Sequence, residues 1–158
     1  MGIEYSIHIP SEFISTHVCQ LLPDWLAPVL SVIIVFQHCP VLLAEKTTET
    51  EFHKRQLRAQ FLRLSRQIVL YLQQLGYQAE IFDPCTGYPL LSQPGPIRLD
   101  DVALVHTSLG YPLTETGGCR MLEHPIWGNA VYPSILLSSA TPNVTQTIVD
   151  QVMTPYSS

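Results

Sequence analysis

The longest helical pattern in the chain, from Thr47 to Leu75, constrains the fold more than any other segment. Its apolar residues recur at spacings of three and four, which places them along one face of a helix: Leu57, Phe61, Leu64, Ile68, Tyr71, Leu72 and Leu75. A threonine can cap its start, and Gly76 can end it. Because a strand-like segment, Tyr77–Phe82, follows directly, the pattern predicts a long helix packed across a sheet.

Strand-like segments before and after this helix supply the rest of the sheet. Glu4–Ile9 alternates polar and apolar residues as a half-buried strand does. Val29–Phe36 has the β-branched density of a buried central strand. Two further strands are predicted over 101–106 and 129–139, and Pro133 requires the last one to be an edge strand or to contain a bulge.

Two shorter helices complete the predicted set of elements. Ser11 and Thr141 are both suitable N-cap residues, and Pro142 fits the first turn of the second helix. The strands and helices do not alternate regularly, as they would in a doubly wound fold. The sequence therefore predicts one α+β domain over residues 1–158, with a mixed or antiparallel sheet and the long helix covering one face.

Composition agrees with a compact core and argues against several partners. Apolar residues make up 46% of the chain and charged residues 13%, while the formal charge of −5 argues against nucleic acid. The apolar run over 25–36 contains Pro28 and falls short of the about 20 residues of a membrane span. With no secretory signal and no Cys-x-x-Cys pair, the four cysteines are expected to be reduced thiols in a cytoplasmic protein.

The common catalytic and phosphate-binding motifs do not occur in this sequence. It has no Gly-x-x-x-x-Gly-Lys-Ser, no Gly-x-Gly-x-x-Gly after a strand and no Gly-x-Ser-x-Gly. Cys85 lies in a predicted turn over 83–87 and has no obvious catalytic helper. Six of the eight basic residues fall within 46–66, where they form either a solvated helix face or a contact for an acidic partner.

One segment, Glu115–Gly128, gathers the residues that suit a site. It holds two adjacent glycines, a cysteine, an arginine, a histidine and a tryptophan within fourteen residues. Glycines let the backbone approach a partner closely, and the cation of Arg120 favours the thiolate form of Cys119. A thiolate suits a soft metal centre or an electrophile. The alternative is a structural cysteine in a tight glycine turn.

The histidine and the tryptophan of this segment have weaker functional readings. If residues 119–124 form a strand, Cys119 and His124 point to opposite faces, which argues against a Cys–His catalytic pair. Trp127 is interpreted as a core residue or a lid over the core, with a binding platform as the alternative.

The same residues resemble a known family. The sequence Leu109–Gly128, continued by Ser138–Pro142, resembles the methylmalonic aciduria and homocystinuria type D protein family, which handles vitamin B12. The family pattern has Leu-Gly-aromatic, an acidic residue, Gly, one or two cysteines, a basic residue, His, Trp-Gly and a later Ala-Thr-Pro. The likeness is good over roughly residues 48–150 and loose over the first 47.

The resemblance implies a fold and a function. It implies an α+β domain akin to the flavin nitroreductases but without flavin, and a trafficking adaptor for cobalamin that is not itself an enzyme. In the family, a thiolate of this segment coordinates the cobalt of cobalamin presented by a type C processing protein, and the complex supplies methionine synthase and methylmalonyl-CoA mutase. Carried over, the cobalt ligand is Cys119, and the cobalamin-binding residues are Gly117, Gly118, Cys119, Arg120, His124 and Trp127.

The chain departs from the family pattern at two places. Animal members carry a Cys-Cys pair whose first cysteine binds cobalt, whereas this chain has Gly118 at that position and keeps only the second. It also lacks the long N-terminal extension with a mitochondrial leader. Two other functions stay open: a flavin-dependent reductase of the related fold, and an interaction scaffold that uses the basic face around Arg55, Arg58 and Arg66.

Overall fold

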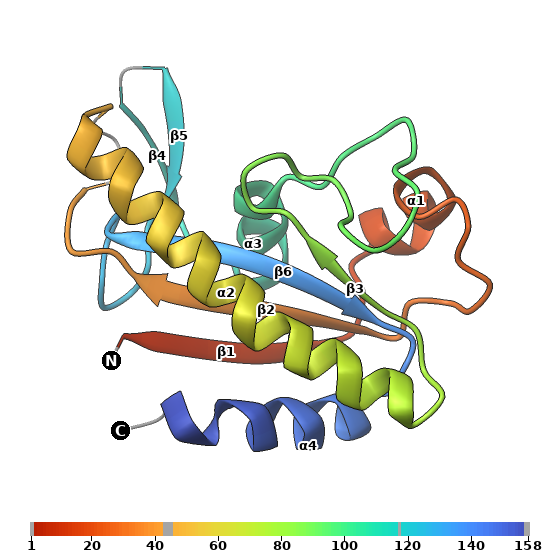
Figure 1. Cartoon of the computed structure of the whole chain (residues 1–158). Coiled ribbons are helices and arrows are strands. Elements are labelled where there is room, and N and C mark those ends of the chain that lie inside the picture. Colours follow the sequence, from red (N-terminus) through yellow and green to blue (C-terminus); the bar gives the residue numbers. More distant parts are fainter. Residues whose placement is uncertain (1, 43–45, 117, 157–158) are drawn as a thin grey trace.

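The computed structural model describes residues 2–42, 46–116 and 118–156, in one α+β arrangement (Figure 1). The strands are β1 (Ile3–His8), β2 (Ser31–His38), β3 (Ala79–Phe82), β4 (Leu113–Thr116), β5 (Cys119–Leu122) and β6 (Val131–Ser138). The helices are α1 (Glu12–Leu21), α2 (Thr48–Gln74), α3 (Asp101–Leu109), α4 (Pro142–Met153) and the short 3-10 helix η1 (Thr154–Tyr156).

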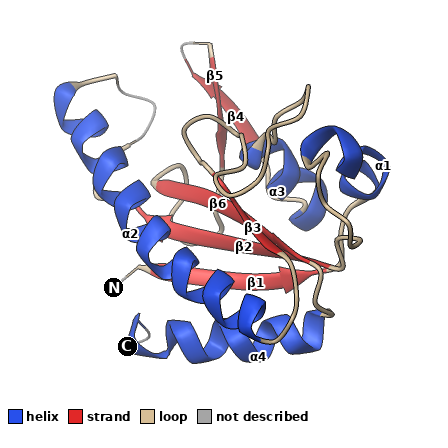
Figure 2. Cartoon of the chain, turned by 45° about the vertical axis from the view of Figure 1, so that its right-hand side comes forward, coloured by secondary structure: helices blue, strands red, loops and turns tan. Residues whose placement is uncertain are grey.

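The main sheet is antiparallel, with strand order β1-β2-β6-β3. Strand β2 lies inside it, and its side chains from Ser31 to Gln37 are all buried, as the β-branched density predicts. The free side of β3 is covered by the following loop, where the amide of Leu90 donates to the carbonyl of Ile81 (3.0 Å). Strands β4 and β5 form a separate hairpin that extends beyond the sheet (Figures 1 and 2).

Helices cover both faces of the sheet. On one face α2 and α4 pack side by side, and the buried cluster there includes Ile33, Phe61, Leu64, Ile68, Leu136 and Val149. On the other face α1 and α3 pack with the hairpin, and that cluster includes Ile14, Ile34, Phe82, Val105, Leu122 and Leu137. The prediction of one long covering helix was therefore incomplete, because α4 shares the face of α2. The relation to flavin nitroreductases stays a prediction.

The long helix α2 confirms most of the periodic pattern, since Phe61, Leu64, Ile68 and Leu72 are buried. Tyr71 and Leu75 were wrongly placed on the buried face, because both are exposed. The hydroxyl of Thr47 accepts a hydrogen bond from the amide of Thr50 (3.1 Å) and so caps the helix. The helix ends before Gly76, which has a φ of +92° that non-glycine residues rarely adopt. Each fully buried apolar side chain on its inner face contributes about 1.5–3 kcal/mol to folding.

The strand predicted over 101–106 is wrong, because these residues start helix α3. Asp100 caps the helix by accepting a hydrogen bond from the amide of Ala103 (3.0 Å), and Gly110 ends it with a φ of +72°. A short apolar run has no periodicity that separates strand from helix, so the caps decide. The strand β4 was also missed, because no strand was predicted over 113–116 from the sequence.

The prediction that Pro133 lies in an edge strand or at a bulge is only partly right. Strand β6 is an interior strand, yet β3 pairs with it only from Ile135 to Ser138. Pro133 pairs with Phe36 of β2 and lies beyond the end of β3. The missing amide hydrogen therefore faces the side on which β6 has no partner strand, which is where proline is tolerated.

Candidate functional site

The candidate site is the β4–β5 hairpin and the turn that follows it. Thr116 pairs with Cys119, so the tip of the hairpin, which includes Gly118, lies between these two residues. Gly118 is exposed, has a φ of +80°, and leaves open space where a Cβ would stand. Gly117 lies outside the described residues. The hairpin projects away from the main sheet (Figure 2).

Cys119 and Arg120 point to opposite faces of the hairpin, as successive strand residues do. The Cys119 side chain is half-buried. The guanidinium of Arg120 donates to the carboxylate of Asp100, with Nη2 and Oδ2 2.8 Å apart. Arg120 therefore neutralises the cap of α3, and its charge is not directed at the neighbouring thiol as the sequence suggested.

His124 is held at both ring nitrogens. Its Nδ1 accepts hydrogen bonds from the amides of Ile126 (3.1 Å) and Trp127 (3.2 Å). Because Nδ1 is an acceptor, the proton is assigned to Nε2, which donates to Oε2 of Glu4 (2.8 Å). The side chain is only 2% exposed. His124 has no free nitrogen for a metal in this arrangement. Its hydrogen bonds instead link β1 to the turn.

Trp127 is the middle ring of a stack of three. Its ring lies 4.6 Å from that of His124 at an interplanar angle of 15°, and 5.3 Å from that of His38 at 28°. The stack joins the turn to the end of β2, and Trp127 packs against the cluster under the hairpin. Its position agrees with the interpretation as a packing residue over the core.

Further contacts hold the base of the hairpin. The side-chain amide of Asn129 donates to the hydroxyl of Thr114 (3.1 Å) and to the carbonyl of Leu122 (2.9 Å), so it ties β4 to β5. The backbones of His124 and Gly128 exchange two hydrogen bonds, of 2.8 and 2.9 Å. The five described residues of the predicted set thus divide into an open tip at Gly118 and Cys119, a link at Arg120, and a fixed base at His124 and Trp127.

Sequence reasoning missed the partners that fix the hairpin. Glu4, His38, Asp100 and Asn129 carry these contacts, and Glu4 lies 120 positions from His124. No local pattern indicates these contacts, since they depend on how distant elements are arranged.

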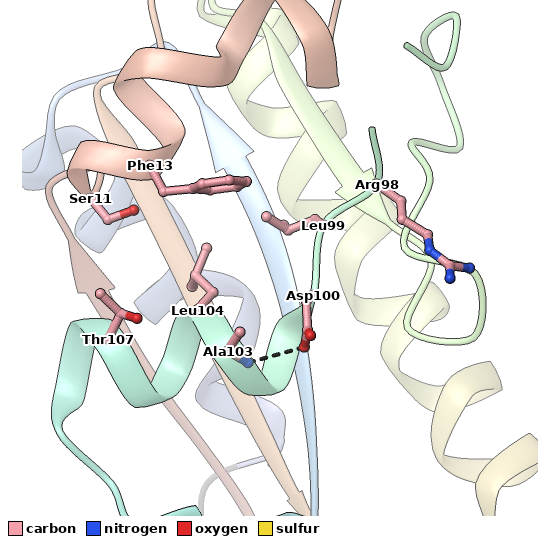
Figure 3. Close-up of a pocket in the computed structure, with 8 residues that line it drawn as sticks. All are labelled: Ser11, Phe13, Arg98, Leu99, Asp100, Ala103, Leu104 and Thr107. Carbon is pink, nitrogen blue, oxygen red and sulfur yellow. Dashed lines mark hydrogen bonds between the residues drawn. The ribbon is translucent and has the colours of Figure 1, made fainter. Parts of the chain in front are cut away.

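Asp100 also borders an apolar cavity of about 280 Å³ between α1 and α3 (Figure 3). The ring of Phe13 and the side chains of Leu99 and Leu104 line it. Its polar lining includes Ser11 and Asp100, which cap their own helices. The cavity lies next to the residue that anchors Arg120, so the start of α3 connects it to the hairpin.

The described residues contain no group of three or more His, Cys, Asp or Glu placed to hold a metal ion. No described helix has the length and apolar character needed to span a bilayer.

Comparison with known proteins places these residues in a family context. The model of the methylmalonic aciduria and homocystinuria type D protein family matches residues 1–151, which include the first 47 residues as well as the motif segment. The cobalamin trafficking protein CblD of Homo sapiens is 23% identical over 141 residues, covering 89% of this chain and 48% of the human protein. The protein of the same name from Rattus norvegicus is 22% identical over 139 residues, covering 88% and 47%. The chain spans about half the length of these curated relatives.

Proposed function

The chain belongs to the methylmalonic aciduria and homocystinuria type D protein family, and from this premise we propose that it is a non-enzymatic adaptor in cobalamin trafficking. The observation that carries the proposal is a thiol next to the open tip of an anchored hairpin. Cys119 is half-buried beside the exposed Gly118, whereas the base of the same hairpin is fixed by His124 and Asn129.

The arrangement suits a thiolate that meets cobalt from outside the molecule. A glycine at 118 has no side chain, and nothing lies within 4 Å of its missing Cβ, so a flat corrin can come close to the backbone at the tip. Arg120 lies on the other face with its charge paired to Asp100. Cys119 thus presents a soft ligand on one face, while the opposite face is held against α3.

The ligand in this chain is proposed to be the second of the two positions that the family pattern offers. Gly118 stands at the first, and its φ of +80° places it in the turn rather than in the strand. Cys119 is the first residue of β5 and pairs with Thr116. The thiol therefore projects from a paired strand, which sets its direction more firmly than a turn residue would.

We place this function in a cytoplasmic relay. Cobalamin reaches Cys119 either free or held by a type C-like processing protein, and passes to B12-dependent enzymes such as methionine synthase or methylmalonyl-CoA mutase. All four cysteines are free in the structure, which suits a reducing compartment. The face of the hairpin that carries Cys119 is the expected contact for the processing protein.

A spectral titration tests the ligand. Cob(II)alamin and aquocobalamin are added to the full chain, alone and with a type C processing protein, and the cobalamin absorption and electron paramagnetic resonance spectra are recorded. We expect a spectral shift with the wild type that is lost in Cys119→Ser. Cys85→Ser is the matched control, because Cys85 is also an accessible thiol, and it should keep the shift. An unchanged shift in Cys119→Ser, or none in the wild type under either condition, would sink the proposal.

A further inference from the structure

A second group of polar side chains surrounds the turn after β3, away from the hairpin tip. Both oxygens of the Asp83 carboxylate accept hydrogen bonds from Arg58, at 2.9 Å from Nε and 2.7 Å from Nη2. Oδ1 of Asp83 also accepts from the amide of Cys85 (2.9 Å). Arg58 of the predicted basic face is therefore committed to this turn, and the paired guanidinium lowers the pKa of Asp83.

A cavity of about 360 Å³ lies between this turn and the first turn of α3. Cys85, Arg98, Asp101 and Tyr132 are among the residues that line it. A neighbouring cavity of about 280 Å³ on the α2 side shares Cys85 and Tyr132 with it. Gly87 fixes the wall, because its carbonyl accepts from the amide of Leu99 (2.8 Å) and leaves no room there for a side chain.

Asp101 is the unusual residue of this cavity. Its Oδ1 is buried and has no hydrogen-bond partner in the described part of the chain. Burial, together with the carboxylates of Asp100 and Asp83, raises the pKa of Asp101 well above its ordinary value. Burial and the proximity of Asp101 also raise the pKa of Tyr132. The lining therefore holds the carboxyl group of Asp101, whose neutral form is favoured, and the neutral phenol of Tyr132. Both groups can donate a hydrogen bond.

The charges around the cavity leave one cation uncompensated. Asp83 is paired with Arg58, and Asp100 is paired with Arg120. Arg98 is exposed and forms no ion pair with any described residue. In the close-up its side chain points away from the apolar pocket between α1 and α3 (Figure 3).

The raised pKa of Asp101 has a consequence for the stability of the folded chain. Because its pKa is higher in the folded chain than in the unfolded chain, folding is penalised as pH rises above the unfolded value of about 3.9. Asp101→Asn removes this penalty. We expect Asp101→Asn to have a higher Tm than the wild type at pH 8, with a gap that narrows toward pH 4. A gap that does not change with pH would contradict the neutral carboxyl.

We propose that the cavity between the turn after β3 and the first turn of α3 binds a small oxyanion, which is a carboxylate or a phosphate group. Arg98 supplies the charge, and Asp101 and Tyr132 supply hydrogen bonds. The volume of the cavity suits a small metabolite rather than a protein segment. The site is independent of the proposed cobalt ligand, because Cys119 does not line it. A carboxylate and a phosphate share this chemistry, and two probes separate them.

The test is a titration of the full chain with inorganic phosphate and, separately, with succinate, in chloride buffer, followed by amide chemical shifts. We expect saturable shifts around Cys85, Arg98 and Tyr132 with at least one probe, and the responding probe identifies the group. Arg98→Gln should weaken binding at least tenfold. Arg66→Gln, an exposed unpaired arginine on α2, is the matched control and should bind as the wild type. Saturation by neither probe, or wild-type binding in Arg98→Gln, would overturn the proposal.

The pH dependence of binding shows whether Asp101 donates a hydrogen bond to the oxyanion. In the wild type, affinity should fall as pH rises through the pKa of Asp101, because a carboxylate repels the bound oxyanion. Asp101→Asn should bind without this fall. If Asp101→Asn does not fold, Tyr132→Phe, which removes the other donor, should still weaken binding. A pH profile shared by Asp101→Asn and the wild type, or unweakened binding in Tyr132→Phe, would refute the assigned donors. Cys119→Ser should leave the titration unchanged, which keeps this result separate from the cobalamin titration.

Discussion

The tip of the β4–β5 hairpin and the turn at His124–Gly128 lie within one short motif but differ in almost every physical respect. At the tip, Gly118 is exposed, with no atom near its missing side chain. At the turn, His124 is 3% exposed and uses both ring nitrogens in hydrogen bonds. One short motif therefore contains an open part and a second, buried part that holds the first in place.

The difference separates two kinds of mutation. A change at the turn should act on stability and leave the chemistry of the folded fraction intact. A change at the tip should act on cobalamin, and it should lower stability only where it strains the left-handed backbone of Gly118. Four substitutions test that separation, from the largest to the smallest expected effect on the free energy of unfolding.

The largest effect is expected for His124→Ala. The substitution removes the hydrogen bond to Glu4, leaves the amides of Ile126 and Trp127 without their acceptor, and opens the ring stack. Losing buried hydrogen bonds and a packed ring together should lower the free energy of unfolding by about 3 kcal/mol. Urea unfolding followed by circular dichroism measures it. A loss below about 1 kcal/mol would mean that the turn is not the anchor.

Gly118→Cys should have an intermediate effect on stability and should strengthen the response to cobalamin. The left-handed backbone at this position, with a φ of +80°, disfavours any side chain by about 1–2 kcal/mol. Space for the side chain is available, so the cost comes from the backbone alone. Gly118→Ala is the control, with the same loss of stability and no second thiol. If Gly118→Cys responds to cob(II)alamin no more than Gly118→Ala does, position 118 offers no ligand geometry.

Asp100→Asn tests the ion pair that links the hairpin to the start of helix α3. Asparagine keeps the cap of α3, because its side-chain oxygen can still accept from the amide of Ala103, but it loses the ion pair with Arg120. Both partners are about half exposed, so the loss should stay within about 0.2–1 kcal/mol and shrink in high salt. Unfolding at low and high ionic strength measures it. A loss that salt does not reduce would show that capping, and not the ion pair, is what the substitution disturbs.

The smallest effect on stability is expected for Cys119→Ser. The half-buried side chain loses little apolar contact, so the free energy of unfolding should change by no more than about 0.5 kcal/mol. The spectral response to cobalamin should nevertheless disappear. A large loss of stability would favour the alternative of a structural cysteine in a glycine turn.

The elements that the sequence predicts well are those with a long or dense pattern. Helix α2 was predicted over 47–75 and spans Thr48–Gln74. The buried strand was predicted over Val29–Phe36, and β2 spans Ser31–His38. Helix α3 was missed because its nine residues hold too few turns for a period to appear, and its cap at Asp100 was not weighed. Short elements are set by their ends and by packing, which a pattern of apolar residues does not record.

The site divides in the same way. The sequence located the segment and separated Cys119 from His124 by assuming a strand over 119–124. The strand β5 contains Cys119 but ends at Leu122, so strand alternation does not extend to His124. The sequence assigned the charge of Arg120 to the thiol, whereas the structure pairs it with Asp100. The oxyanion cavity was not foreseen, because Asp101 was assigned to a strand and Tyr132 comes from a distant element. Contacts between such elements follow from topology, which one sequence does not display.

The position of β1 has a consequence for the order in which the chain folds during synthesis. The first strand needs the last helix, because the hydroxyl of Tyr5 donates to Asp150 (2.6 Å) and α4 packs beneath β1. On the ribosome β1 can pair with β2 early, but its apolar face stays uncovered until α4 has emerged. A transcript truncated before Pro142 would therefore yield a chain with all six strands and the complete hairpin that is nonetheless expected to aggregate.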